Sequence, residues 1–334
     1  ESDALLGLLG SVSITHLAQG PYSQGTGFMF LYHMLTAGAG GYKRVRYARG
    51  GMDNLIAALA EKATSQGVEI QTSTAVQQIL LDNGRATGIQ LTDGTTITAE
   101  RVISTTTPKQ TMFGMVGAPN LPPSIVRRVK NGIYRGITAK LNLSLRELPA
   151  FNGQTAAEQL HGHIVISPSL DYLERAFDAT KYGRIAEKPY LDMVLRKAHD
   201  GSGAYTLAMT MQYAPYHLRG TDWASQRDTL SKIILGTLEE YATGIRDLIT
   251  GQTLWTPLDL EEQFGLTEGS VTHGQMELGQ MFALRPVLSG SGPSQRPFET
   301  VIPNLYIAGS GAHPGGGFTG RPGLMAAQVL LAEA

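Results

Sequence analysis

The sequence predicts a two-domain protein that combines an α/β part with an α+β part, and three observations support this class. The chain has 334 residues, and a domain usually holds about 100–200 residues. Residues 51–105 alternate helix-like and strand-like segments, and an apolar strand at 304–308 leads into a glycine-rich loop and a helix. Residues 137–145 and 205–213 alternate apolar with polar side chains, the period of half-buried antiparallel strands.

Composition excludes several classes of protein. Hydrophobic residues make up 42% and charged residues 16% of the chain, which fits a globular enzyme rather than a disordered segment. The net charge of −1 gives no indication of nucleic-acid binding. Without cysteine, the chain has no disulfide, thiolate nucleophile or iron–sulfur ligand. No apolar stretch approaches the length of a membrane-spanning helix.

The segment from residue 51 to residue 105 is the most regular part of the chain. A helical stripe of apolar residues follows Gly51, and Gly67 stops it. Asp82-Asn83-Gly84-Arg85 is a hairpin-turn signal between two apolar runs. We expect strands at 68–70, 75–81, 86–91, 96–99 and 101–105.

The pattern of apolar and polar residues changes after residue 118. Two alternating strands at 137–145 and 205–213 precede a long amphipathic helix, which Asp222 caps and whose apolar stripe runs to Leu248. We therefore expect residues 119–295 to form an antiparallel sheet with helices on one face. Residues 51–118 and 296–334 are interpreted as two pieces of the other domain.

The terminal glycine loop, Gly309 to Gly320, lies between an apolar strand and an apolar helix. A glycine-rich turn at a helix N-terminus is typical of a site for phosphate or another electron-rich group. The dinucleotide fingerprint G-x-G-x-x-G nevertheless fails, because Pro314 stands at the third glycine position and the chain ends at Ala334 without a second strand. The pairs at 38/40, 201/203 and 290/292 also lack a third glycine and are interpreted as turns.

Four segments together resemble a known family. They are "RGGMDNLIAALAEKATSQGVEI", "GRATGIQLTDGTTITAERVIST", "TPLDLEEQFGLTEGSVTHGQMELGQMFALRP" and "NLYIAGSGAHPGGGFTGRPGLMAAQ". They are similar to phytoene desaturases, retinol saturases and related FAD-dependent oxidoreductases. The terminal motif is the most specific of the four, since many flavoproteins share the helix–strand–hairpin segment.

The resemblance implies an incomplete FAD-binding, Rossmann-like domain of the glutathione-reductase type, with an inserted antiparallel-sheet substrate domain. Residues 51–118 and 296–334 would form the FAD-binding part, and 1–50 with 119–295 the substrate domain. The family opens with a strand–GxGxxG–helix unit that this chain lacks. We therefore expect a C-terminal part that works with an N-terminal polypeptide carrying that unit, whether a separate subunit, a cleavage product or a segment removed from the chain.

The resemblance also implies which residues contact FAD. The terminal loop would pass the flavin, and the glycines at 315–317 would let the backbone approach the flavin ring. Gly309 and Ser310 would lie against the pyrophosphate–ribityl stretch of FAD. Ser310 departs from the acid that many relatives have there, and Arg321 stands where the family often has alanine. The expected cofactor-binding residues are Val76, Thr105, Gly309, Ser310, Gly315, Gly316, Gly317, Phe318, Thr319 and Gly323.

The implied reaction is hydride transfer between a substrate carbon and flavin N5, which needs positioning, exclusion of water and sometimes one proton donor. Three residues are catalytic candidates: His313, His273 and Arg285. His313 shares a loop with the glycines, which favours a functional role. For His273 and Arg285 a structural role is equally favoured, as a buried histidine satisfied by backbone and as an arginine that ties two domains.

Other polar residues have ordinary interpretations. His161 and His163 have strand spacing without a carboxylate nearby in the sequence, so we expect a structural role and no metal site. The basic cluster Lys43, Arg44, Arg46 and Arg49 is interpreted as a solvated face, with contact to phosphates or a phospholipid surface as the alternative.

Two further segments bear on the substrate. Tyr22, Tyr32 and His33 lie in a region where the family builds part of its substrate cavity, and they are weak candidates. The Met-rich strand 205–213 is interpreted as core, or alternatively as the wall of a lipophilic cavity.

Three functions remain open at this point. The leading hypothesis is an FAD-dependent oxidoreductase that dehydrogenates or saturates an apolar or polyene-like substrate. The second is an amine- or alcohol-oxidising flavoenzyme on the same scaffold, and the third is a non-catalytic module that binds a partner or a lipid. We expect no nucleic-acid partner and a location in the cytoplasm or an organelle matrix, with peripheral membrane contact left open.

Overall fold

The structure is a computed structural model that describes residues 2–36, 48, 50–154, 156–198, 202–286, 288, 298–316 and 319–332. The chain divides into two compact units, each built from two stretches of sequence. Unit 1 comprises Glu1–Thr72 and Ile137–Thr256, and unit 2 comprises Ser73–Gly136 and Pro257–Ala334. The basic residues Lys43, Arg44, Arg46 and Arg49 lie outside the described residues.

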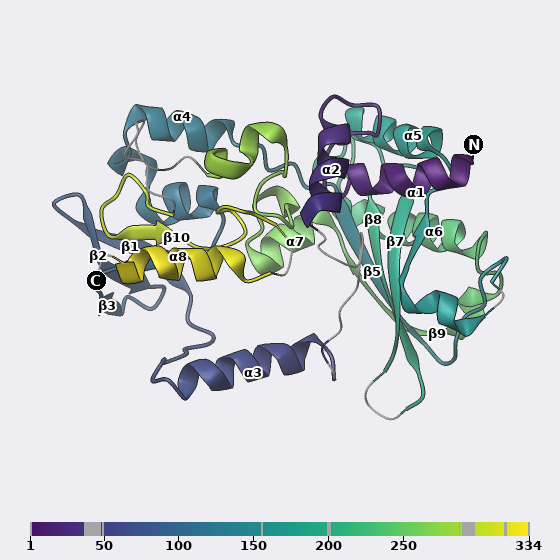
Figure 1. The fold of residues 1–334 in the computed structure, drawn as a ribbon, viewed down its shortest axis with the longest axis horizontal. Helices are drawn as coiled ribbons and strands as arrows, with labels where there is room; N and C mark the ends of the chain where they lie inside the picture. The colour runs from purple at the N-terminus through teal and green to yellow at the C-terminus, as the bar shows by residue number, and fades with distance from the viewer. Residues whose placement is uncertain are drawn as a thin grey trace. The chain divides into compact units, whose positions relative to one another are not determined.

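Unit 1 is organised around an antiparallel sheet in the order β6-β7-β8-β5-β9, five strands among the described residues (Figure 1). The two strands predicted from alternation, β5 and β8, are central neighbours, with Leu141 opposite Met209. The strands are β5 (Thr138–Leu145), β6 (His163–Ile166), β7 (Tyr190–Lys197), β8 (Tyr205–Gln212) and β9 (Ile249–Trp255).

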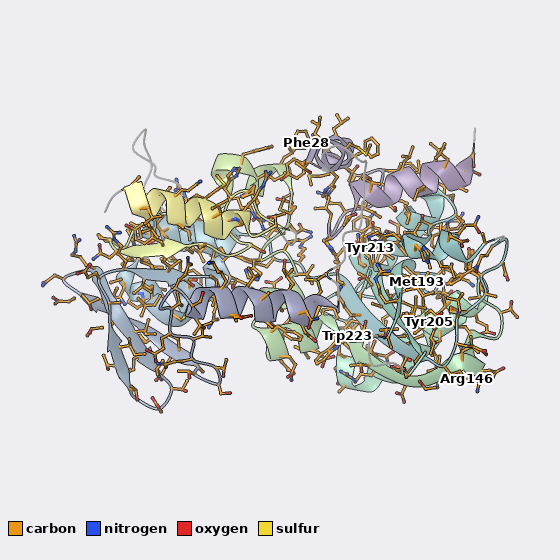
Figure 2. The ribbon with its side chains drawn as sticks, turned by 60° about the horizontal axis from the view of Figure 1, so that its bottom comes forward. Phe28, Arg146, Met193, Tyr205, Tyr213 and Trp223 are labelled. Carbon is orange, nitrogen blue, oxygen red and sulfur yellow. The ribbon has the colours of Figure 1, made fainter. Side chains whose placement is uncertain are left out.

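One face of the central strands β7, β8 and β5 is apolar and buried. Leu141, Met193 and Met209 are each at most 1% exposed, because alternate side chains of a strand point to the same face. Met193 and Tyr213 lie inside the unit in Figure 2. The methionines of β8 are therefore core residues, as one of the two interpretations predicted.

The opposite face of the sheet carries polar side chains. Lys140 Nζ donates to Thr210 Oγ1 at 3.0 Å, and burial lowers the pKa of Lys140 while Asp192 counteracts that shift. His163 Nδ1 lies 2.7 Å from Asp192 Oδ1. A carboxylate distant in sequence thus partners this histidine, in keeping with the structural role we expected for it.

Helices of unit 1 begin at capping residues that the sequence displays. Asp222 Oδ1 accepts a hydrogen bond from Ser225 N at 2.8 Å and confirms the predicted cap. The helix ends at Glu239 rather than continuing to Leu248, because Gly244 takes a left-handed φ of 81° and starts a separate turn. The α-helices of this unit are α1 (Asp3–Ser13), α2 (Thr26–Thr36), α3 (Met52–Thr64), α5 (Leu170–Lys181) and α6 (Trp223–Glu239). Its short 3-10 helices are η3 (Ala157–His161) and η4 (Ile245–Leu248).

A buried glutamine fastens the end of α1 to the sheet. Gln212, 2% exposed, donates through Nε2 to the carbonyls of Ile14 and Leu17 and accepts the His16 amide through Oε1. These long-range hydrogen bonds fix the course of the chain after α1, which the sequence pattern alone did not indicate.

Unit 2 contains two small sheets. The first has the order β1-β2-β3, and its hairpin turn has positive φ at both Asn83 and Gly84, as a type I′ turn requires. The second pairs β10 with β4 in parallel, with Leu305 beside Val102. The strands are β1 (Val76–Asp82), β2 (Arg85–Leu91), β3 (Thr96–Thr98), β4 (Val102–Ser104) and β10 (Leu305–Ile307).

Helices of unit 2 share one hydrophobic core with these sheets. The cluster contains Ile79 of β1, Ile125 of α4, Leu305 of β10 and Ala326 of α8. The α-helices are α4 (Pro123–Asn131), α7 (Pro257–Phe264) and α8 (Arg321–Ala332). Gln110–Val116 (η1) is a π-helix, and 3-10 helices occupy Ala118–Asn120 (η2), Thr267–Gly269 (η5), Leu278–Gln280 (η6) and Phe282–Leu284 (η7).

The boundaries expected from sequence differ from these units in three segments. Residues 51–72 group with unit 1, while 119–136 and 257–295 group with unit 2. Packing explains the second difference, because Ile125 and Val129 of α4 belong to the same core cluster as β10. The sequence pattern changes after residue 118, but the residues that follow pack in the same hydrophobic core as the residues before it.

Two predicted apolar segments lie at the surface. The helix α3 forms as expected, but Ile56 and Leu59 on its apolar stripe are 55% and 63% exposed. Residues 68–70 form no strand, and Val68 is half exposed. Among the residues that the structure describes, none of the helices combines the length and hydropathy needed to cross a membrane.

Candidate functional site

The glycine loop leaves β10 directly over the end of β4. Ala308 N donates to Ser104 O at 2.9 Å, and the loop then turns with Ala312 N donating to Gly309 O at 2.9 Å. A methyl group at Gly309 would collide with the carbonyl oxygen of Thr105. Thr105 and Gly309, both expected near the cofactor, are therefore neighbours.

Contacts within the protein explain why several loop positions are glycine. A Cβ at Gly311 would lie 2.5 Å from Pro108 Cδ, and one at Gly315 would meet the Arg285 side chain and Met276 Sδ. Gly315 also has a φ of +83°, which favours glycine. We expected the glycines at 315–317 to admit a flavin ring and Gly309 to lie against the pyrophosphate–ribityl part of FAD. At 309, 311 and 315 the missing side chain makes room for neighbouring protein atoms.

The remaining expected cofactor residues are distributed more widely. Val76 opens β1, Thr319 accepts the Arg321 amide at 3.2 Å near the start of α8, and Gly323 has open space where a Cβ would stand. Gly317 and Phe318 lie outside the described residues. Gly316 is tight but not closed, because a Cβ there would lie 3.4 Å from Thr272 Cγ2.

Arg285 connects this loop to a second one. Its side chain is buried, 5% exposed, and all five N–H groups of the guanidinium are used. They donate to the backbone carbonyls of Thr272, Gly274, Gln275, Gln280 and Ser310. Apart from the short contact to Thr272, the donor–acceptor distances lie between 2.9 and 3.3 Å. This arrangement, which we call the Arg285 clamp, supports the structural interpretation of Arg285.

His273 stands on the second loop in a strained conformation. Its φ is +54°, which is uncommon for a residue other than glycine. Burial lowers the pKa of His273, and the positive charge of Arg285 lowers it further. The imidazole is therefore neutral at pH 7, with one ring nitrogen able to donate and the other able to accept.

Three nitrogen atoms around the clamp have no hydrogen-bond partner among the described residues. They are Nδ1 of His273, Nε2 of Gln275 and Nδ1 of His313, and each is buried. Buried polar atoms are normally satisfied, so this concentration at two adjoining loops is consistent with a bound polar group. Two of the catalytic candidates, His273 and His313, therefore lie on the two loops that the Arg285 clamp joins.

The substrate candidates in the first fifty residues have structural contacts of their own. Tyr22 OH donates to Asp171 Oδ1 at 2.7 Å, and this hydrogen bond raises the pKa of Tyr22. Tyr32 and His33 form an edge-to-face pair on α2 with ring centroids 5.7 Å apart. Nothing in these contacts draws the three residues toward a common cavity.

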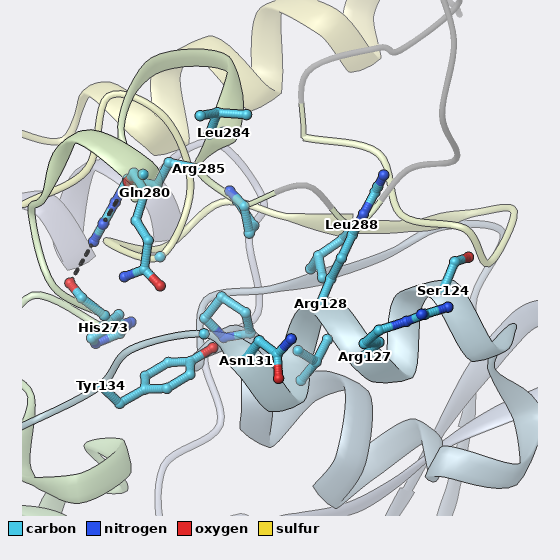
Figure 3. Close-up of a pocket in the computed structure, with 17 residues that line it drawn as sticks. Ser124, Arg127, Arg128, Asn131, Tyr134, His273, Gln280, Leu284, Arg285 and Leu288 are labelled. Carbon is cyan, nitrogen blue, oxygen red and sulfur yellow. Dashed lines mark hydrogen bonds between the residues drawn. The ribbon is translucent and has the colours of Figure 1, made fainter.

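A cavity of about 750 Å³ lies in unit 2 beside the clamp (Figure 3). Sequence reasoning missed it, although Ser124, Arg127, Arg128 and Asn131 follow the helical spacing i, i+3, i+4 and i+7 on α4. The lining residues are Pro108, Ser124, Arg127, Arg128, Val129, Asn131, Gly132, Tyr134, His273, Gly274, Gly279, Gln280, Leu284, Arg285, Pro286, Leu288 and Gly311. Within the described residues, no three side chains gather as a metal site would require.

Comparison with known proteins shows which proteins this chain is similar to. Residues 5–154 match the model of a family described as flavin containing amine oxidoreductase. Pyridine nucleotide-disulfide oxidoreductase domain-containing protein 2 of Mus musculus is 30% identical over 347 residues, which cover 100% of this chain and 59% of that protein. The lycopene-forming phytoene desaturase of a Paracoccus species is 27% identical over 300 residues, covering 86% of this chain and 56% of the relative.

The fold has a close counterpart among solved structures. A crystal structure of an oxidoreductase from Methanosarcina mazei matches with a TM-score of 0.60 at 19% identity, covering 99% of this chain and 64% of that one. This likeness supports the expected fold class of helices and sheets with an antiparallel sheet domain. The chain spans about three fifths of the length of these two curated relatives.

By these matches the chain is similar to flavin-containing oxidoreductases. The phytoene desaturases among its relatives are 27% and 25% identical, in agreement with the resemblance that the four sequence segments indicated. The family match also supports the expected cofactor, FAD, because the matched model describes flavin-containing proteins.

Substitution of Gly309 by alanine should destabilise unit 2, because the added methyl group meets the backbone oxygen of Thr105, which cannot move without breaking the strand end. Gly323→Ala is the matched control, since nothing lies within 4 Å of its Cβ position. Thermal unfolding followed by circular dichroism should show a lower midpoint for Gly309→Ala only. Equal midpoints for the two variants would contradict this loop geometry.

Protonation of His273 should destabilise the fold at acid pH. Its pKa is depressed in the folded state, so the unfolded chain binds more protons and the free energy of unfolding falls as the pH drops below about 6.5. His273→Asn should remove part of this dependence, and asparagine tolerates the left-handed backbone. Urea unfolding at about pH 7.5 and about pH 5.5 measures the difference.

The exposed His217 provides the control for that measurement, since His217→Asn removes a histidine without touching the clamp. If His273→Asn loses as much stability on acidification as the wild type and His217→Asn do, the buried imidazole is not the group responsible.

Proposed function

We propose that this chain holds the flavin ring of FAD and takes part in hydride transfer between an apolar or polyene-like substrate and flavin N5. One observation carries the proposal: a clamped glycine loop at a strand–helix junction, bordered by buried unpaired nitrogens, in a chain of the flavin-dependent family. Bound FAD would supply the two-electron chemistry, and the protein supplies binding and orientation.

The residues available to FAD fit an electron-rich group. The N-terminus of α8, which begins at Arg321, follows the loop and stabilises negative charge by roughly 0.3–2 kcal/mol. Gly316 and Gly323 remain as positions where a bound group can approach the backbone, whereas Gly309, Gly311 and Gly315 shape the loop itself. Polar contacts would come from the glycine loop, through Ser310 and Thr319, and from Thr105 at the end of β4.

His313 and His273 are the chain's own candidates for moving or holding a proton. Each has a buried Nδ1 without a partner among the described residues. A neutral imidazole can donate from one nitrogen and accept at the other. Arg285 is assigned a positioning role, because its donors are used by backbone carbonyls.

A partner polypeptide with the GxGxxG unit is part of the proposal. The parallel pair β4–β10 is short, and parallel strands are usually buried on both faces. Yet Ile103 of β4 is 49% exposed, and Leu324 and Leu331 of α8 are 60% and 77% exposed. An N-terminal strand–loop–helix segment would cover such surface and supply the phosphate contacts that this chain lacks.

Amine or alcohol oxidation is the second candidate function. The description of the matched family as amine oxidoreductases favours it, while the Paracoccus relative is named a phytoene desaturase. Assays with an amine and with an apolar polyene, each followed by flavin bleaching without oxygen, distinguish the two. Bleaching by the amine alone would reject the apolar substrate.

The visible absorption spectrum tests whether the chain holds flavin with a partner. We expect flavin absorption when the chain is purified together with a polypeptide carrying GxGxxG, and Gly316→Leu should abolish it because the side chain fills the approach to the loop. Gly162→Leu is the matched control, because Gly162 is exposed in unit 1 and nothing lies within 4 Å of its Cβ position. A colourless complex, or an unchanged spectrum in Gly316→Leu, would contradict this placement of the flavin.

A further inference from the structure

We propose that the cavity beside α4 is a second binding site, which takes a small anionic ligand with a carboxylate or phosphate head and an apolar body. This inference goes beyond the proposed flavin site because α4 supplies residues that neither the family motif nor the clamp includes, although the clamp forms part of the opposite wall.

The first support is the face that α4 turns to the cavity. Ser124, Arg127, Arg128 and Asn131 all line it, whereas Ile125, 1% exposed, packs into the core. The helix therefore packs Ile125 into the core and carries a hydroxyl, two guanidinium groups and an amide on the cavity side, together with the buried Val129. Figure 3 shows Ser124 and the Arg127 side chain along the same part of this helix. Arginine suits carboxylate and phosphate because its fork donates two parallel hydrogen bonds.

The second support is the charge of the lining. None of the seventeen described residues that line the cavity is aspartate or glutamate, while Arg127, Arg128 and Arg285 all contribute to it. The whole chain carries a net charge of −1, so this concentration of positive charge is local. A concave site lined by one sign of charge attracts ligands of the opposite sign.

The opposite wall offers neutral donors and apolar surface. His273 presents a neutral imidazole whose Nδ1 has no partner among the described residues. Burial raises the pKa of Tyr134 to about 12, so its hydroxyl keeps its proton. Leu284, Leu288 and Pro286 add apolar lining, and about 750 Å³ falls within the range of small-molecule sites.

The cavity also adjoins the flavin loop, because Gly311 and Arg285 belong to its lining. The anionic group could therefore come from FAD itself or from a separate molecule. A competition experiment distinguishes these sources, and displacement by FAD would assign the cavity to the cofactor and overturn a second site.

Isothermal titration of the 334-residue chain with octyl phosphate and with octanoate tests the proposal, and octanol is the uncharged control. We expect binding of at least one of the two anions and none of octanol. The double variant Arg127→Gln/Arg128→Gln should weaken that binding by about tenfold or more, because charge-assisted hydrogen bonds are lost.

Lys130→Gln is the matched control, since it removes one positive charge from the same helix at a position that does not line the cavity. It should leave the affinity nearly unchanged, and circular dichroism should show that all variants keep the fold. The proposal is overturned if neither anion binds, if Lys130→Gln weakens binding as much as the double variant, or if FAD displaces the anion.

Discussion

The guanidinium of Arg285 is the interaction on which the candidate site depends. A buried positive charge is costly unless its hydrogen bonds are made, and here every N–H finds a backbone carbonyl on one of two loops. The described part of the glycine loop contains no helix or strand, and the second loop contains only the short 3-10 helix η6, so the clamp takes the place of a longer hydrogen-bond ladder. Burial lowers the pKa of His273, and the positive charge that the clamp places beside this imidazole lowers it further.

The clamp changes the meaning of the glycine loop. Glycine at 309, 311 and 315 lets the loop lie against Thr105, Pro108 and the Arg285 side chain. These three glycines therefore serve the packing of the loop against the rest of the chain. Ligand contact is left to the fewer positions that stay open, such as Gly316, and to the end of the loop that leads into α8. A sequence motif shared by a family can therefore record the shape of a loop as much as its contacts with a cofactor.

Local signals were sufficient to predict much of the fold. Asn83-Gly84 predicted the hairpin and Asp222 predicted a helix start, since both act through neighbouring backbone. Long-range contacts were not visible in the same way. Gln212 binding the end of α1, Asp192 pairing with His163, and the five carbonyls around Arg285 join residues distant in sequence. The sequence shows the polar stripe on α4. It does not show which distant residues lie opposite that stripe, so the cavity was not predicted.

Hydrogen exchange of Arg285→Met tests the central claim most directly. If the clamp holds both loops, the amides of Ala312 and Gln275, which are hydrogen-bonded in the wild type, should exchange faster together, while those of β5 and β8 in unit 1 keep their protection. Unchanged protection at Ala312 and Gln275 in a folded variant would contradict the account, because the loops would then be held by something other than Arg285.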